Sequence, residues 1–203
     1  MFTILRKLYD WVLHWAKTPY GPIALFVLSF SEASFFPIPP DVLLIALALG
    51  NRKQSFKFAL ICSIASIMGA MGGYSIGYFL WWNGDGYNEI AHFFFNHIPG
   101  FNESIFLDIQ NQYDYYGFII TFTAGFTPIP FKVFTISAGA FNISFPLFLI
   151  ASTISRSARF FFVSFLIVRY GEKVEGFINQ YFNLLTVVFV IILIGSYILI
   201  KFV

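Results

Sequence analysis

The sequence predicts an all-α integral membrane protein with two inverted repeats, each a re-entrant helical hairpin followed by a transmembrane helix, and with interfacial amphipathic helices. Of the 203 residues, 58% are hydrophobic and 11% are charged, whereas roughly a quarter are charged in soluble domains. The mean hydropathy is +0.76. Two long stretches are apolar, and two other apolar stretches are each broken by closely spaced prolines. We therefore expect residues 1–203 to form a single membrane domain.

The first element, residues 1–19, is expected to be an amphipathic helix lying in the membrane interface. Leu5, Leu8, Val12 and Trp15 recur at helical spacing, and charged residues occupy another face. The segment lacks the uncharged core and the cleavage site that are typical of a signal peptide.

The first repeat, residues 20–82, begins with the predicted re-entrant hairpin. Pro37, Pro39 and Pro40 are too closely spaced for one continuous helix. The apolar run on each side would span about 13–15 Å as a helix, which is half of the ~30 Å hydrocarbon core. The uncharged run Phe58–Trp82 that follows is long enough to cross the bilayer.

The second half of the chain repeats this order. Residues 83–114 form a polar, outward-facing segment, and residues 115–168 form a second repeat that is broken at Pro128 and Pro130. Each long helix crosses after its hairpin has returned, so the second repeat starts from the opposite side, as in many transporters. Chance resemblance between two Pro-Ile-Pro tripeptides is the alternative explanation. Residues 169–203 are expected to hold an interfacial helix and a last transmembrane helix.

Basic residues determine the predicted orientation. Those that flank the spans are expected on one side of the membrane: Arg6, Lys7, Lys17, Arg52, Lys53, Lys57, Arg169 and Lys173. The 83–114 segment has several acidic residues but no Lys or Arg. We therefore expect a multi-pass protein with a cytoplasmic N-terminus.

Five charged residues fall at membrane depth: Glu32, Asp41, Lys132, Arg156 and Arg159. Each costs roughly 2.5–3.5 kcal/mol to insert unless it is paired or hydrated. Both hairpin tips should approach the midplane, and the two arginines share one helix face. The five side chains are therefore expected to converge.

These charges are suited to binding an anionic head group. Lys132, Arg156 and Arg159 would bind it, because guanidinium groups match phosphate geometry. Glu32 and Asp41 would compete for the same cations, so that protonation of a carboxylate would couple transport to protons. Two alternatives remain open: Glu32 pairs with Arg156 or Arg159 purely as structural support, and Asp41 is only a helix N-cap.

Gly69, Gly73 and Gly77 form a stripe that allows another backbone to approach closely. This stripe would pack against a hairpin or the other repeat, or would mediate dimerisation, so a homo-oligomer is possible.

The sequence has no nucleotide-binding or hydrolase motif, no metal-ligand spacing and no adjacent nucleophile and base. We therefore expect no enzymatic activity, no cofactor and no metal. The net charge of +2 gives no reason to expect nucleic acid as a partner.

Several motifs, in this order, resemble the DedA family (the VTT or SNARE-associated domain), and the YqaA-like branch most closely, over residues 20–170. They are Glu32 followed by Pro37-Ile38-Pro39-Pro40-Asp41, Gly69-xxx-Gly73-Tyr74-xx-Gly77, and Phe126-Thr127-Pro128-Ile129-Pro130-Phe131-Lys132 with Ala138-Gly139. The resemblance implies paired re-entrant hairpins, residence in the bacterial inner membrane and lipid translocation. Bacterial relatives are linked to recycling of undecaprenyl phosphate, distant eukaryotic relatives scramble phospholipids, and some members depend on the proton-motive force.

By this resemblance, Glu32 and Asp41 match the acidic positions of the first hairpin. Many members place arginines in the second hairpin, whereas here that stretch supplies only Lys132, and Arg156 and Arg159 would substitute from the following helix. The expected function is a flippase or scramblase for an anionic, phosphate-bearing lipid. A proton-dependent exchanger of small solutes or ions and a non-transporting structural protein are the alternatives.

Overall fold

The computed structural model describes residues 14–15, 18–36, 38–84, 86–98, 102–127 and 130–171. Most of the expected N-terminal interfacial helix, the whole of residues 172–203, and the prolines at positions 37 and 128 lie outside the described residues.

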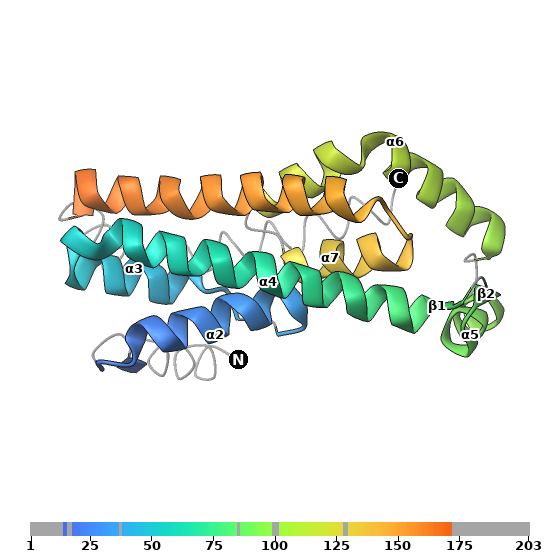
Figure 1. Ribbon diagram of the computed structural model, residues 1–203, viewed down its shortest axis with the longest axis horizontal. Coiled ribbons are helices and arrows are strands. Elements are labelled where there is room, and N and C mark those ends of the chain that lie inside the picture. The colour runs from blue at the N-terminus through green and yellow to red at the C-terminus, as the bar shows by residue number, and fades with distance from the viewer. Residues whose placement is uncertain are drawn as a thin grey trace.

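The described part of the chain is mostly helical, which confirms the expected all-α class (Figure 1). In chain order the helices are α2 (Gly21–Ser34), α3 (Asp41–Gly50), the 3₁₀-helix η1 (Arg52–Gln54), α4 (Ser55–Trp81), α5 (Glu89–His97), α6 (Glu103–Phe126), α7 (Phe131–Ala140) and a long helix, Phe145–Gly171. Two short strands, β1 (Trp82–Asn83) and β2 (Gly86–Tyr87), form a small antiparallel hairpin.

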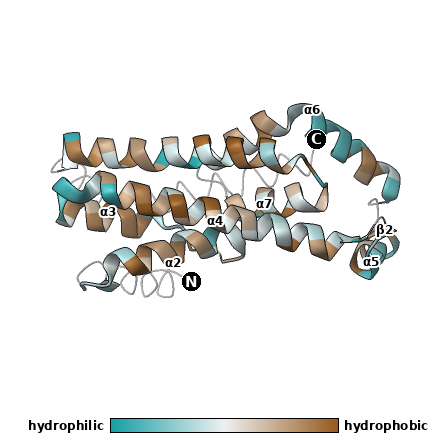
Figure 2. Cartoon of the chain, viewed as in Figure 1, coloured by the Kyte–Doolittle hydropathy of each residue, from teal (hydrophilic) through white to brown (hydrophobic). Residues whose placement is uncertain are grey.

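Two helical stretches, Arg52–Trp81 and Phe145–Gly171, are long and apolar enough to cross a membrane. They coincide with the two long crossing helices expected from the sequence. Apolar residues run along both helices, whereas hydrophilic residues gather on α5 and on the first turns of α6 (Figure 2). The three helices α2, α3 and α7 are apolar but shorter.

Proline residues separate the helices of two pairs, α2–α3 and α6–α7. Pro40 is the N-cap of α3, and Pro130 is the N-cap of α7. Proline is well tolerated there, because the first residues of a helix have no intrahelical acceptor for their N–H groups. We call the described connecting residues 35–36 and 38–40 the first tip, and Thr127 and Pro130 the second tip.

The start of the second helix pair differs from the expectation. A boundary was expected between residues 114 and 115, but α6 continues from Glu103 to Phe126 as one helix. No proline interrupts this stretch, so the hydrogen-bond ladder propagates through the expected boundary. The outer segment and the second helix pair therefore share one rigid element.

Helix α4 lies at the centre and packs against α2 and α7 through its glycine stripe. A Cβ at Gly69 would lie 2.2 Å from the Phe30 carbonyl oxygen, and one at Gly77 would lie 1.9 Å from the Ile136 carbonyl oxygen. These distances leave no room for a side chain. The stripe is thus occupied within the chain, by both helix pairs.

Two hydrophobic clusters fill the interior. One joins α2, α3 and α4 to the long helix through residues such as Leu25, Leu43 and Phe160. The other joins α4, α6 and α7 to the start of the long helix, around Tyr74 and Phe148.

The region around residues 81–114 is attached to the end of α7. Trp82 donates from Nε1 to the carbonyl oxygen of Ala140 (2.8 Å), and Gln110 donates from Nε2 to that of Phe141 (2.7 Å). The buried ring of Phe106 lies between Trp81 and Phe141, with ring centroids 5.3 and 4.9 Å away. This aromatic packing fixes the position of the second helix pair.

Candidate functional site

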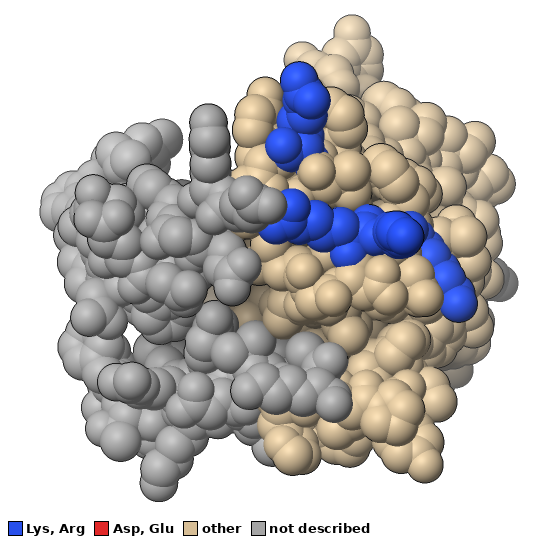
Figure 3. All heavy atoms as spheres, turned by 90° about the vertical axis from the view of Figure 1, so that its left-hand side faces the viewer, with Lys and Arg blue, Asp and Glu red and all other residues tan. Residues whose placement is uncertain are grey.

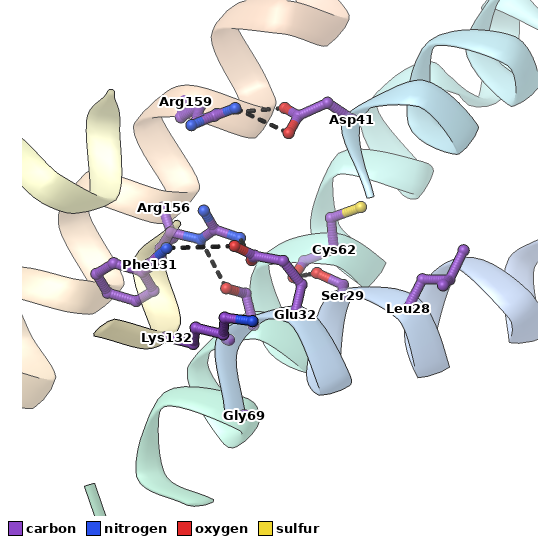
Figure 4. A network of polar contacts seen from close by, with 12 residues as sticks. Leu28, Ser29, Glu32, Asp41, Cys62, Gly69, Phe131, Lys132, Arg156 and Arg159 are labelled. Atoms are coloured by element: carbon purple, nitrogen blue, oxygen red, sulfur yellow. Dashed lines mark hydrogen bonds and ion pairs between the residues drawn. The ribbon is translucent and has the colours of Figure 1, made fainter. Parts of the chain in front are cut away.

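The structure joins the two carboxylates near the first tip to the two arginines of the long helix as separate pairs (Figure 4). Arg156 Nη2 lies 2.6 Å from Glu32 Oε2. Arg159 binds Asp41 in a bidentate fashion, with Nη2–Oδ2 at 2.8 Å and Nε–Oδ1 at 3.2 Å. The sequence left open which arginine pairs with Glu32, and the structure assigns Arg156.

The Glu32–Arg156 pair is deeply buried, with exposed fractions of 7% and 1%. Arg156 also donates from Nε to Ser66 Oγ on α4, at 2.7 Å. Its guanidinium carbon lies 5.0 Å from the Phe131 ring centroid and 4.7 Å from that of Phe160, within range of cation–π attraction. One arginine therefore connects α2, α4 and α7 to the long helix.

Glu32 also lies at the beginning of α7. Its Oε1 accepts a hydrogen bond from the backbone N–H of Phe131, at 3.4 Å. The first N–H groups of a helix are unsatisfied and carry a partial positive charge, which favours an anion. A carboxylate of the first helix pair thus occupies the anion-attracting end of a helix in the second.

The Asp41–Arg159 pair is more accessible, with side-chain exposures of 17% and 14%. Asp41 is the first residue of α3, and no side chain caps this helix, so the structure does not show the alternative role of Asp41 as an N-cap. Arg159 also donates from Nη1 to the carbonyl oxygen of Thr127. The arginine therefore bridges the first helix pair to the second tip.

Lys132 does not join these pairs, contrary to the expected convergence of all five charges. Its Nζ donates to the carbonyl oxygen of Phe35 in the first tip, at a long 3.4 Å. No ion pair links it to Glu32 or Asp41 among the residues that the structure describes. Lys132 follows the first residue of α7, where the helix dipole is unfavourable for a cation, and its side chain reaches across to the facing tip.

Comparison with known proteins places the chain in a family. It is 32% identical over 202 residues to an uncharacterized protein of Haemophilus influenzae, an alignment that covers 98% of each chain. The chain belongs to the family of that protein.

Other relatives extend the family. An uncharacterized homologue in Histophilus somni is 34% identical over 207 residues, covering 98% of this chain and 99% of the relative. An uncharacterized protein of the archaeon Methanocaldococcus jannaschii is 29% identical over 140 residues, covering 69% and 79%. No family model and no solved structure matches the chain.

Sequence reasoning missed several groups that surround the arginines. Ser66 resembles other serines of α4, such as Ser63, which donates to the Ala59 carbonyl of its own helix, so nothing in the sequence distinguished it. Phe160 could have been found, because it lies four residues after Arg156 and hence on the same helix face. The Thr127 carbonyl carries no signal in the sequence, because every residue has a carbonyl group.

Among the described residues, no group of three or more His, Cys, Asp or Glu side chains could hold a metal ion.

Proposed function

We propose that members of this family move a lipid with an anionic, phosphate-bearing head group, such as undecaprenyl phosphate or a phospholipid, across the membrane. The bidentate Asp41–Arg159 pair, which lies between the two tips, carries this proposal. In this proposal the protein is a multi-pass protein of the bacterial inner membrane. The pairs α2–α3 and α6–α7 act as the re-entrant hairpins of inverted repeats, as the resemblance to the DedA family suggests.

The geometry of the Asp41–Arg159 pair supports exchange with phosphate. A guanidinium group binds a carboxylate or a phosphate through the same two parallel N–H donors. A phosphate can therefore replace the Asp41 carboxylate on Arg159 without a change in the position of the arginine. The partial exposure of this pair makes it the more accessible of the two.

The energetic cost of buried charges also supports a functional role. Buried ion pairs contribute little to stability compared with well-packed apolar residues of similar volume. The chain nevertheless keeps one buried ion pair and one partly buried ion pair on the same helix. Such pairs are better explained by an exchangeable ligand than by stability.

A carboxylate that loses its arginine to phosphate is left in a poorly solvated site. Burial and the loss of a cation both favour the protonated form of a carboxylate. Binding of the head group would therefore be accompanied by proton uptake on Asp41 or Glu32, which couples translocation to a proton gradient.

A flipping assay in proteoliposomes tests the proposal. Undecaprenyl phosphate and phosphate-bearing phospholipids are supplied with and without a pH gradient, and a neutral lipid serves as the reference. We expect Glu32→Gln, Arg156→Ala and Arg159→Ala to abolish translocation in correctly inserted, folded protein. The exposed Arg169 on the same helix provides the matched control, Arg169→Ala, which should retain activity. Near-control rates in all three site variants would overturn the proposal.

The burial of Arg156 favours one second candidate, a non-transporting structural protein. All three kinds of contact around this guanidinium, to Glu32, to Ser66 and to two rings, are internal. If this candidate is correct, replacing Glu32 and Arg156 together by apolar residues should restore both stability and cellular function. Restored stability without restored translocation would instead support the transporter.

A further inference from the structure

An exposed aromatic face on α6 leads to the second tip. The rings of Phe118, Phe122 and Phe126 stack along the helix, with centroids 6.1 and 6.3 Å apart and interplanar angles of 16° and 2°. Phe118 is 40% exposed and Phe126 is 44% exposed, and Phe122 between them is half-buried. We call these three residues the phenylalanine ladder.

The ladder lies on a different face from the one that packs inward. The buried face of α6 includes Gly117 and Gly125. A Cβ at Gly117 would lie 3.5 Å from the Ile143 side chain, and one at Gly125 would lie 2.1 Å from Ser155 Oγ on the long helix. None of the ladder residues is among the buried residues of α6.

The ladder ends beside the ion pairs. Phe126 is the last residue of α6, and the next residue, Thr127, accepts the hydrogen bond from Arg159 Nη1. The facing first tip is open to the surroundings, since Phe35 is 61% exposed and Phe36 is 39% exposed. Lys132, which is partly exposed, reaches across to the Phe35 carbonyl. The Asp41–Arg159 pair, whose side chains are 17% and 14% exposed, is thus partly accessible beside these exposed residues.

Among the described residues, buried apolar side chains fill the helix interior around the ion pairs. On one side of the ion pairs, Leu25, Leu43 and Phe160 are fully buried in one hydrophobic cluster. On the other side, Phe131 and Phe148 are fully buried in the second cluster. A lipid whose head group entered the site would have to keep its chain outside the helices.

We propose that the phenylalanine ladder binds a hydrocarbon chain of the phosphate-bearing lipid while its head group passes between the tips toward Lys132 and Arg159. This inference rests on the proposed function and names the part of the substrate that the ion pairs do not contact. Aromatic rings offer a large apolar surface with few rotatable bonds, which suits them to hold a flexible chain. Because the ladder extends for about 12 Å along α6, the site should favour long chains over short ones.

Photochemical crosslinking tests where the chain lies. The photoreactive amino acid p-benzoylphenylalanine is placed at position 122 or, as a control, at position 165, where Phe165 is 52% exposed on the long helix. Nanodiscs contain a radiolabelled tracer, either phosphatidic acid or diacylglycerol with the same chains. We expect phosphatidic acid to label position 122 about fivefold more than position 165. We expect diacylglycerol to label both alike, and Arg159→Ala to abolish the preference.

A functional comparison accompanies the crosslinking. The triple variant Phe118→Leu, Phe122→Leu, Phe126→Leu should flip a long-chain phosphate lipid about tenfold more slowly. A control triple at other exposed positions, Phe79→Leu, Phe93→Leu and Phe165→Leu, should flip it at the wild-type rate.

The two proposals fail in different ways. The ladder proposal would be overturned if phosphatidic acid labelled positions 122 and 165 equally, or if the ladder triple flipped lipid as fast as its control. The proposed function would still stand in that case if Arg159→Ala remained defective. Normal flipping by Arg159→Ala together with Glu32→Gln and Arg156→Ala would overturn the proposed function itself and the ladder with it.

Discussion

The side chain of Arg156 contacts residues of three other helices. Its edge donates to Glu32 and Ser66, and its faces contact Phe131 and Phe160. A planar guanidinium can use its edge and both faces at once, whereas the ammonium group of lysine cannot. The identity of this residue, and not only its charge, therefore determines how four helices meet.

Removing only one member of the buried pair should be costly. We expect Arg156→Met to lower the free energy of unfolding by about 3–5 kcal/mol, because Glu32 is left buried without its cation. The double variant Glu32→Leu, Arg156→Met should recover most of this loss, since no buried charge remains. Denaturation in detergent, followed by circular dichroism, measures both. A double variant no more stable than the single one would contradict this prediction.

Removing one member of the Asp41–Arg159 pair should destabilise the fold less than removing one member of the Glu32–Arg156 pair. Asp41→Asn leaves Arg159 with its bond to the Thr127 carbonyl and with partial access to its surroundings. We expect a loss of about 1 kcal/mol in the free energy of unfolding, clearly smaller than the loss in Glu32→Gln. The same denaturation experiment ranks the two variants, and the reverse order would show that burial does not determine the cost.

At the scale of elements, the contact between α4 and α7 depends on glycine on both sides. A Cβ at Gly77 would lie 1.9 Å from the Ile136 carbonyl oxygen, and one at Gly139 would lie 1.9 Å from that of Tyr74. Both obstacles are backbone atoms, which cannot be moved by a change of rotamer. The depth at which α7 sits against α4 is therefore set by these two glycines.

Gly77→Ala should separate the two helices. We expect a loss of about 1–3 kcal/mol in the free energy of unfolding, because α7 must shift as a whole. Gly50→Ala is the matched control, since nothing lies within 4 Å of a Cβ at that position, and it should change stability by less than about 0.5 kcal/mol. A small effect at Gly77 would show that the helices adjust without cost.

The packing of α6 around Tyr113 should become less stable at alkaline pH. Burial raises the pKa of Tyr113 from 10.0 to about 12, and its ring lies 5.3 Å from that of Phe141. The folded state favours the neutral phenol, so this stabilisation is present below pH 10 and is lost as the pH rises toward 12.

Alkaline unfolding of Tyr113→Phe measures this effect. The transition should move to higher pH, because the variant has no phenol to ionise at this position. Tyr115→Phe, in which the replaced residue is 81% exposed, should leave the transition in place. The prediction would be contradicted if the wild type, Tyr113→Phe and Tyr115→Phe all unfolded at the same alkaline pH.

At the scale of the whole molecule, charge is divided between the two ends. Basic side chains gather at the end formed by η1, the start of α4 and the end of the long helix, where no described acidic residue is visible (Figure 3). This basic end comprises Arg52, Lys53, Lys57 and Arg169. The opposite end carries acidic residues of α5 and α6, such as Glu89 and Asp108. In a bacterial membrane the basic end is expected to face the cytoplasm.

Cysteine labelling tests this orientation. The natural Cys62 is fully buried, so a new surface cysteine provides the reactive site. We expect a membrane-impermeant maleimide to label Ser104→Cys in intact spheroplasts, and to label Gln54→Cys only after permeabilisation. Both positions are exposed. The opposite pattern would reverse the predicted topology.

Much of the architecture follows from local properties of the sequence. A hydrophobic run predicted the long helix that ends near Trp81, and prolines 40 and 130 marked the starts of α3 and α7. Hydrophobicity and proline geometry act over a few residues, so they can be recognised without knowledge of the fold. The sequence did not predict the continuity of α6, because the polar first part of this helix and its apolar second part differ in composition. One backbone hydrogen-bond ladder nevertheless runs through both parts.

Hydrophobicity and charge along the chain suffice to predict apolar helices, two of them long enough to cross a membrane, with five charged residues among them. The pairing of Glu32 with Arg156, the pairing of Asp41 with Arg159 and the separate position of Lys132 arise from the packing of the helices. Glu32 and Arg156 are 124 residues apart in the chain. Their meeting depends on the rotation and depth of helices that backbone contacts at the glycines of α4 hold in place, and no local pattern encodes such long-range geometry.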